Sequence, residues 1–420
     1  MKTKVSHYLF CILLSYSIYL QTSIEVYFSP DDNLTSHFVD YINNEHKSID
    51  IAIYTLTSKE IVKALIVAHK RGVKVNVLVD EYSLTTHIKF NAIDELIKSH
   101  IPLYLFNPKQ FYNSGSGRAQ LFYNAYPALS NYMQIGEQPV LPGGKVKLGG
   151  RPLMHHKFCL FNDNDKIGST VWTGSFNFTY TADKYNQENA VVISDNEIYR
   201  SFKKQFEIMK RHRSTRLTRY TKKDYGTEVK EIFFTPDQQV TERLIELIDD
   251  EQEKIDIAIY SLSHKEITEA LIRAKERGVD ITILIDHGDH KKLAHAGVSI
   301  YSFDPAKYNA GIEKEGSTNK ENMYDHRSHQ NILMHNKFCI FYKNKDNKKL
   351  VWTGSMNFTY SSTYTAQNNV IILNDSHAIT KFEKQFNLMK ENRSKNYIPK
   401  KTFIEDVTEK LSLAFRSFTS

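Results

Sequence analysis

The stretch Met154-His155-His156-Lys157-Phe158-Cys159-Leu160-Phe161 returns later in this 420-residue chain as Met334-His335-Asn336-Lys337-Phe338-Cys339-Ile340-Phe341. Each copy places a His and a Lys two residues apart in an apolar run typical of a β-strand. Strand alternation puts both side chains on one face. Charged residues are rarely buried without a role. The same pair at the same spacing in two places therefore indicates a shared chemical function for this His-x-Lys motif.

A second matched segment follows each motif and reads Trp-Thr-Gly-Ser-x-Asn-Phe-Thr, at 172–179 and at 352–359. Its serine lies twenty positions after the motif histidine in both copies (175 − 155 and 355 − 335). The serine and asparagine side chains are candidate hydrogen-bond donors to a bound anion. The alternative role is turn formation after the glycine. The candidate residues of this segment are Ser175, Asn177, Ser355 and Asn357.

The motifs belong to a longer internal repeat. Residues 49–54 are identical to residues 255–260, at an offset of 206 (260 − 54), whereas the motif histidines are 180 residues apart (335 − 155). The first copy therefore holds about 26 extra residues (206 − 180) between Asp80 and His155. The stretch at 107–152 that contains them is predicted to be a long loop, which we interpret as a functional lid. The second copy has a shorter counterpart at 311–329. This self-similarity predicts a duplicated domain.

Each copy is predicted to run strand, helix, strand, helix, strand. The pattern Thr57-x-x-Glu60, like Ser263-x-x-Glu266, indicates a capping box that opens a helix. Gly72 and Gly278 are predicted to end those helices. Apolar strands that alternate with helices favour an α/β fold with each sheet covered on both faces. The repeated acids Asp50, Asp256, Asp80 and Asp286 at strand ends are expected to cap neighbouring helices.

The N-terminus has the features of an export signal. Lys2 and Lys4 precede an apolar run at 8–20, which is short for a membrane span. We expect an exported protein, secreted or periplasmic, and an uncleaved N-terminal anchor that tethers it to the membrane is the alternative. The predicted domain plan is a leader at 1–23, a first domain at 24–209, a basic linker at 210–229, a second domain at 230–402 and a C-terminal helix or tail at 403–420.

Composition narrows the class of partner. The net charge of +7 favours a phosphate-bearing partner without choosing between lipid and nucleic acid. The three cysteines show no metal-ligand spacing, so neither a zinc site nor a disulfide framework is indicated. Cys159 and Cys339 are predicted to be buried core residues, with a disulfide between the repeats as the less favoured alternative.

The residue types of the motif suit phosphoryl transfer. A neutral imidazole is a nucleophile toward phosphorus, and a second, protonated imidazole can donate a proton to the leaving oxygen. Lys157 and Lys337 supply positive charge for the non-bridging oxygens. This chemistry predicts phosphodiester cleavage through a covalent phosphohistidine, with no metal and no cofactor.

The paired His-x-Lys motifs with Gly-Ser-x-Asn resemble the phospholipase D superfamily, over nearly the whole chain after the leader. The resemblance implies two tandem α/β/α sandwich domains packed with pseudo-twofold symmetry. It also implies metal-independent phosphodiesterase activity, in which one motif histidine, His155 or His335, is the nucleophile and the other the general acid. Two positions depart from the family pattern. The Asp expected five residues after the Lys is Asn162 in the first copy and Tyr342 in the second.

The second departure concerns a glutamate that often follows the Gly-Ser motif in this family. Glu188 occupies that position in the first copy, whereas Asn368 occupies it in the second. Glu188 is therefore the candidate that orients one of the two imidazoles. The asymmetry indicates unequal roles for the histidines without telling which histidine has which role.

Several functions are compatible with these residues. The leading hypothesis is a hydrolase that acts at a phospholipid membrane surface and releases phosphatidic acid. The alternatives are a non-specific endonuclease of the same superfamily, a phosphatidyl transferase, and a protein that only binds phosphates. No obligate protein partner is inferred.

Overall fold

The computed structural model of the protein describes residues 23–80, 92–106, 153–166, 168–210, 229–236, 238–288, 290–308 and 332–397. The predicted leader before residue 23, the 107–152 and 311–329 loops, the body of the linker and the 403–420 tail lie outside these ranges. Within the described ranges, no helix has the length and apolar character that a bilayer span requires.

The chain forms two compact units. The first comprises the described residues of 23–106, 153–183 and 189–232, and the second comprises those of 184–188 and 233–397. The short segment Lys184–Glu188 thus groups with the second unit, although its neighbours on both sides in the chain belong to the first. The domain boundaries derived from the sequence remain a prediction.

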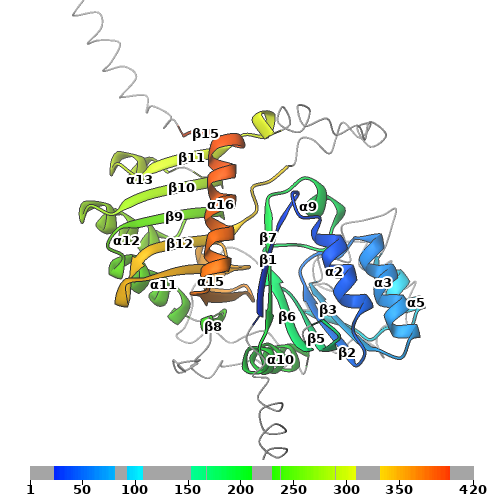
Figure 1. The fold of residues 1–420 in the computed structure, drawn as a ribbon. Coiled ribbons are helices and arrows are strands. Elements are labelled where there is room, and N and C mark those ends of the chain that lie inside the picture. The colour runs from blue at the N-terminus through cyan, green and yellow to red at the C-terminus, as the bar shows by residue number, and fades with distance from the viewer. Residues whose placement is uncertain are drawn as a thin grey trace, which may run out of the picture. The chain divides into compact units, whose positions relative to one another are not determined.

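The first unit is built on a seven-stranded sheet with the order β1-β7-β6-β5-β2-β3-β4 (Figure 1). Strands β2, β3 and β4 run parallel, and β5, β6 and β7 continue the sheet antiparallel. Its elements are β1 (Ser23–Ser29), α2 (Leu34–Asn43), β2 (Ser48–Ile53), α3 (Lys59–Lys70), β3 (Lys74–Asp80), α5 (Ala92–Lys98), β4 (Leu103–Phe106), β5 (Lys157–Asn164), β6 (Gly168–Gly174), α9 (Tyr180–Lys184), β7 (Glu188–Ser194) and α10 (Asn196–Lys210).

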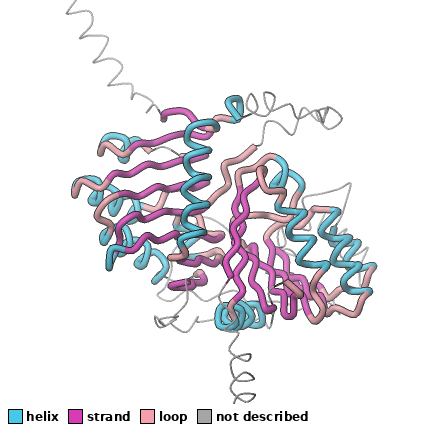
Figure 2. The backbone as a smooth tube through the Cα atoms, viewed as in Figure 1, coloured by secondary structure: helices cyan, strands magenta, loops and turns pink. Residues whose placement is uncertain are grey.

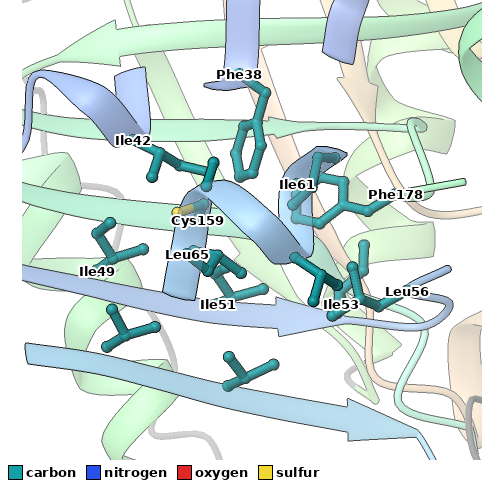
Figure 3. Packing of buried hydrophobic residues seen from close by; sticks show 14 of the residues in the cluster. Phe38, Ile42, Ile49, Ile51, Ile53, Leu56, Ile61, Leu65, Cys159 and Phe178 are labelled. Atoms are coloured by element: carbon teal, nitrogen blue, oxygen red, sulfur yellow. The ribbon is translucent and has the colours of Figure 1, made fainter. Parts of the chain in front are cut away.

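Helices cover both faces of this sheet because its strands are apolar on both. Phe38 of α2 and Leu65 of α3 pack with Ile51 and Cys159 in the core on one face (Figure 3). On the other face, Phe158 contacts Phe202 of α10, with ring centroids 5.2 Å apart. Burial of such side chains contributes about 2 kcal/mol each to folding. The predicted α/β architecture is confirmed for this unit.

The second unit repeats the arrangement in an eight-stranded sheet, β15-β11-β10-β9-β12-β13-β14-β8. Figure 2 shows the same alternation of strands and helices as in the first unit. Its elements are β8 (Val229–Phe234), α11 (Gln238–Asp250), β9 (Lys254–Ser261), α12 (Lys265–Glu276), β10 (Asp280–His287), α13 (Lys291–His295), β11 (Ser299–Phe303), β12 (Lys337–Asn344), the 3-10 turn η3 (Lys345–Asn347), β13 (Lys348–Gly354), α15 (Tyr360–Tyr364), β14 (Asn369–Leu373), α16 (Ser376–Asn392) and β15 (Ser394–Asn396).

Both faces of the second sheet are also covered. Leu244 of α11 and Leu271 of α12 lie in the core on one face. On the other face, Phe338 contacts Phe382 of α16, with ring centroids 4.9 Å apart. The duplication predicted from the sequence therefore appears as two copies of one fold, with β15 added at the edge of the second.

The predicted helix caps were displaced by one residue. The N-cap of α3 is Ser58, whose hydroxyl accepts a hydrogen bond from the Ile61 amide, and not Thr57. The N-cap of α12 is His264, which makes no side-chain capping bond, and not Ser263. The C-terminal prediction was correct: Gly72 follows the C-cap Arg71 with a φ of 97°, a value that favours glycine.

The two described cysteines are free and buried, as predicted. Cys159 and Cys339 lie in the helix-covered cores on matching strands. Burial in apolar surroundings raises the pKa of both thiols. They act as small apolar residues of the core.

Candidate active site

In the first unit, the motif stands at the start of β5. Lys157 is the first residue of the strand and only 1% exposed, whereas His155 lies two residues before the strand and is partly exposed. The Lys157 ammonium donates a hydrogen bond to the His155 carbonyl at 2.7 Å. The Tyr54 ring contacts both the His155 imidazole and the Lys157 ammonium, so the two side chains lie on one side, as the spacing predicts.

In the second unit, Lys337 begins β12 and is 1% exposed, and its ammonium donates to the His335 carbonyl. His335 is 8% exposed. Its Nδ1 lies 2.9 Å and 2.8 Å from the two carboxylate oxygens of Glu188. Because a carboxylate accepts hydrogen bonds, this contact places a proton on Nδ1 and leaves Nε2 as the reactive nitrogen.

Backbone pairing holds Glu188 in this position. The Gln187 amide donates to the Leu333 carbonyl at 2.8 Å, and the His335 amide donates to the Gln187 carbonyl at 2.9 Å. The Leu333 amide donates to the Asn186 side chain at 3.1 Å. These hydrogen bonds fix the Glu188 carboxylate beside the His335 imidazole, where the carboxylate is fully buried. The corresponding Asn368 instead binds the Ser362 carbonyl and the Ser355 hydroxyl.

Burial dominates the electrostatics of Lys337. It lowers the pKa of the ammonium to about 7, and the nearby carboxylates of Glu188 and Asp286 oppose that shift. The pKa of Tyr260 is raised by burial and by Asp286, so its phenol is neutral at ordinary pH. The site in the second unit therefore contains an ammonium whose charge depends on pH near neutrality.

The Gly-Ser-x-Asn residues occupy different environments. Ser175 and Ser355 are fully buried. The backbone N–H groups of Asn189 and Asn369 donate hydrogen bonds to their hydroxyls at 2.9 Å and 3.2 Å. These contacts tie each motif to the next strand, which is a structural role. Asn177 and Asn357 are partly exposed, and their Oδ1 atoms are buried without a hydrogen bond from the described residues.

The glycine of this segment is required by a close approach between strands. Gly354 has a φ of 149°, and a Cβ there would lie 2.1 Å from the Asn369 carbonyl oxygen. We expect Gly354→Ala to lower the free energy of unfolding by about 3 kcal/mol or more, because backbone atoms must move apart. Urea unfolding monitored by circular dichroism measures this loss.

Gly278→Ala is the matched control for that substitution. Gly278 also has a positive φ, 92°, but its added Cβ would have nothing within 4 Å. We expect Gly278→Ala to lower the free energy of unfolding by only about 1 kcal/mol, because backbone strain is its only cost. Equal losses in the two variants would show that the close approach to Asn369 is not the reason for the glycine.

Among the described residues, the repeated acids bind groups in and beside the sheets, where the sequence predicts helix caps. Asp50 is buried and binds Lys203 and the Asn76 amide. Asp256 is buried and accepts a hydrogen bond at 2.7 Å from the hydroxyl of Tyr342, the residue at the family's Asp position. A buried carboxylate needs such partners, and these acids find them within the sheet and its neighbours.

Asp80 and Asp286 have a different function, which the sequence analysis missed. Their carboxylates accept hydrogen bonds at 2.8 Å and 2.6 Å from the amides of Met154 and Met334, the residues just before the motif histidines. Both acids thereby hold their motif in place. The signal that could have found them was their repetition at the same position in the two copies, Asp80 in β3 and Asp286 in β10.

His156 and Asn336 separate the motif residues and are fully buried. The Asn336 amide lies 3.4 Å from the Met389 sulfur of α16, on the other face of the sheet. Within the described residues, no group of three or more His, Cys, Asp and Glu side chains is placed to hold a metal ion. Metal independence remains a prediction for experiment.

Comparison with known proteins defines the family. The model of the cardiolipin synthase, PLD-like domain matches residues 38–210 and 244–390, which together make up most of the chain. The protein therefore belongs to the phospholipase D-like family, as the doubled motif predicts.

Its curated relatives are distant and are matched in part. A phospholipase D of Rickettsia prowazekii is 32% identical over 142 residues, which are 34% of this chain and 58% of that protein. A mitochondrial cardiolipin hydrolase of Chlamydomonas reinhardtii is 25% identical over 172 residues, which are 41% of this chain and 55% of that protein. The match thus spans little more than half the length of each relative.

Solved structures share the fold over nearly the whole chain. A phosphatidylserine synthase of Haemophilus influenzae has a TM-score of 0.57 at 11% identity, with 94% of this chain and 93% of that chain covered. A polyphosphate kinase from Porphyromonas gingivalis has a TM-score of 0.54 at 13% identity, with 95% of this chain and 54% of that chain covered. Identities this low concern the fold alone.

Proposed function

We propose that the protein is a phosphodiesterase of the phospholipase D type that cleaves phospholipids through a covalent phosphohistidine. The observation that carries this proposal is that each unit places a histidine beside a buried lysine in the same arrangement. A buried ammonium is costly, so its presence twice beside an imidazole supports a role with an anionic substrate.

The chemistry assigns a task to each group. One imidazole Nε2 attacks phosphorus, the phosphorus–oxygen bond of the leaving alcohol breaks, and the second histidine gives its proton to that oxygen. Water, activated by the now neutral second histidine, then attacks the phosphohistidine and releases phosphatidic acid. Lys157 and Lys337 balance the charge on the non-bridging oxygens, with Asn177 and Asn357 as neutral partners.

The position of the Glu188 carboxylate favours different catalytic roles for the two motif histidines. A neighbouring negative charge favours the protonated imidazole, so His335 is suited to be the general acid. His155 is then the nucleophile. In the second repeat the position of Glu188 is held by Asn368, which carries no charge.

Phospholipid is the proposed substrate class. The relatives named phospholipase D and cardiolipin hydrolase support it, as does the predicted leader, which would bring the enzyme to a membrane. The net charge of +7 suits anionic lipid and nucleic acid equally, so endonuclease activity is the competing function. Transfer of the phosphatidyl group to an alcohol shares the first half-reaction with hydrolysis.

A paired assay of the full-length protein tests this proposal. One set of reactions contains vesicles of phosphatidylcholine, phosphatidylethanolamine or cardiolipin, and the other contains single-stranded DNA or RNA, all with EDTA. We expect phosphatidic acid from each lipid, together with phosphatidylglycerol in the case of cardiolipin, and intact nucleic acid. Added ethanol should divert part of the product to phosphatidylethanol, and the share diverted measures transfer against hydrolysis.

The other outcomes are equally informative. Cut nucleic acid with unchanged lipid would make the protein a nuclease. Loss of lipid cleavage in EDTA that metal restores would point to metal-dependent chemistry. No cleavage of either substrate would favour a protein that only binds phosphates.

A further inference from the structure

A tyrosine occupies the same place beside the motif in both units. The Tyr54 ring centroid lies 5.0 Å from that of His155 at 60°, and 5.1 Å from the Lys157 ammonium. The Tyr260 centroid lies 5.1 Å from that of His335 at 62°, and 5.2 Å from the Lys337 ammonium. One ring therefore contacts both reactive side chains in each unit, with nearly identical geometry.

The backbone fixes the ring relative to the motif. The Tyr54 amide donates to the His156 carbonyl at 2.9 Å, and the Tyr260 amide donates to the Asn336 carbonyl at 3.0 Å. These carbonyls belong to the residue between the motif His and Lys. The tyrosine and the motif are thus joined by a strand hydrogen bond, and neither can shift without the other.

The tyrosine ring offers the buried lysine ammonium a favourable electrostatic contact. Lys157 and Lys337 are each 1% exposed, so burial has removed most of the hydration of both ammonium groups. The face of an aromatic ring carries partial negative charge and attracts a cation within about 6 Å, more strongly where water is excluded. Edge contact with the imidazole also restricts the rotation of the histidine ring.

We propose that Tyr54 and Tyr260 are positioning residues that keep the motif lysine charged and hold the motif histidine in its reactive orientation. This inference rests on the proposed phosphodiesterase function. Simple packing is the competing explanation, and it would require neither contact with the ammonium nor the same geometry in both units.

The titratable groups around Lys337 make the proposal measurable. The groups that face it are His335, Tyr260, Glu188 and Asp286. Burial lowers the pKa of Lys337 to about 7, while the two carboxylates favour the ammonium. Loss of the ring should lower that pKa further, because one of the groups that favour the charged form is gone.

Titration of Lys337 by NMR, with lysine labelled at Cε, tests the effect directly in the full-length protein. We expect Tyr260→Leu to lower the pH at which Lys337 loses its proton by about one unit, whereas Tyr260→Phe, which keeps the ring face, should change it little. The alkaline limit of the activity profile should move to lower pH by a similar amount in Tyr260→Leu. Tyr260→Met is a second ring-free variant in case the leucine variant fails to fold.

Tyr301→Leu is the matched control, because its ring holds the Lys390 ammonium at 5.3 Å, away from the motif residues. It should leave the titration of Lys337 unchanged. An unaltered Lys337 titration in folded Tyr260→Leu or Tyr260→Met would overturn the proposal. Because this readout does not need turnover, the NMR result still decides the role of the ring if the protein proves to have no phosphodiesterase activity.

Discussion

Replacement of either motif histidine by alanine is expected to lower phosphodiesterase activity by about 1,000-fold or more. His155→Ala removes one imidazole and His335→Ala the other, and nucleophilic and acid catalysis each contribute several orders of magnitude. Both histidines lie two residues before their strands and outside the hydrophobic cores of the two units, so the fold should persist. Release of phosphatidic acid from vesicles measures the loss, with circular dichroism as the test of folding.

The control for this experiment is His156→Asn. His156 lies between the motif residues, and the second copy carries Asn336 at the same position. This variant should keep activity within a few fold of the unaltered protein. If His155→Ala or His335→Ala also kept such activity, the two-histidine mechanism would be wrong.

A change of leaving group separates the two roles. p-Nitrophenolate leaves without a proton, so phosphatidyl-p-nitrophenol needs a nucleophile but no general acid. The acid-deficient variant should recover bond cleavage with this substrate, and the nucleophile-deficient variant should not. The Glu188 contact with His335 leads us to expect recovery in His335→Ala. Recovery in His155→Ala instead would reverse the assignment.

Lys337→Met should separate stability from activity. The loss of positive charge at the phosphate is expected to lower turnover by about 100-fold. The fold should nevertheless become more stable, because methionine fills the same buried space without a charge to desolvate. Thermal unfolding at pH 6 and pH 9, together with the lipid assay, measures both effects.

The sign of the pH dependence follows from the pKa of Lys337. It is about 7 in the folded protein, against an ordinary value of 10.5. Below pH 7 the lysine is charged in both states, and the folded state bears the whole cost of burial. Between about pH 7 and 10.5 the unfolded state binds more protons, so the stability of the unaltered protein rises with pH. The gain from Lys337→Met should therefore be larger at pH 6 than at pH 9.

Lys349→Met is the control for that comparison, because the Lys349 side chain is about half exposed. Its effect on stability should be small and similar at the two pH values. A Lys337→Met variant that is less stable than the unaltered protein at pH 6 would show that the buried ammonium stabilises the fold.

The sequence predicted the duplicated fold because the repeat is nearly exact where strands are buried. Residues 49–54 and 255–260 are identical, and both form strands with the same neighbours. The predicted helix starts are one residue early, because Thr57 and Ser263 fit the capping-box pattern although Ser58 and His264 are the actual N-caps. Pattern alone does not reveal which residue adopts the N-cap conformation.

The contacts of the site were less predictable. Glu188 could be identified as a partner for one imidazole, but its contact with His335 depends on pairing between 186–188 and 333–335, which are far apart in the chain. Tyr54 and Tyr260 were visible as repeated residues but were indistinguishable from core aromatics. Their proximity to the motif arises from sheet register, which a single sequence does not specify.

The hydrogen bond between Tyr342 and Asp256 bears on any attempt to restore the family consensus in this chain. Tyr342 occupies the position at which the family motif has an aspartate. Its hydroxyl donates a hydrogen bond to the buried Asp256 carboxylate of the neighbouring strand β9. Introducing the consensus acid at this position would set two carboxylates against each other in a poorly hydrated part of the sheet. Asp256 then has to share its Lys254 partner with a second carboxylate, so we expect the consensus aspartate at position 342 to destabilise the second unit.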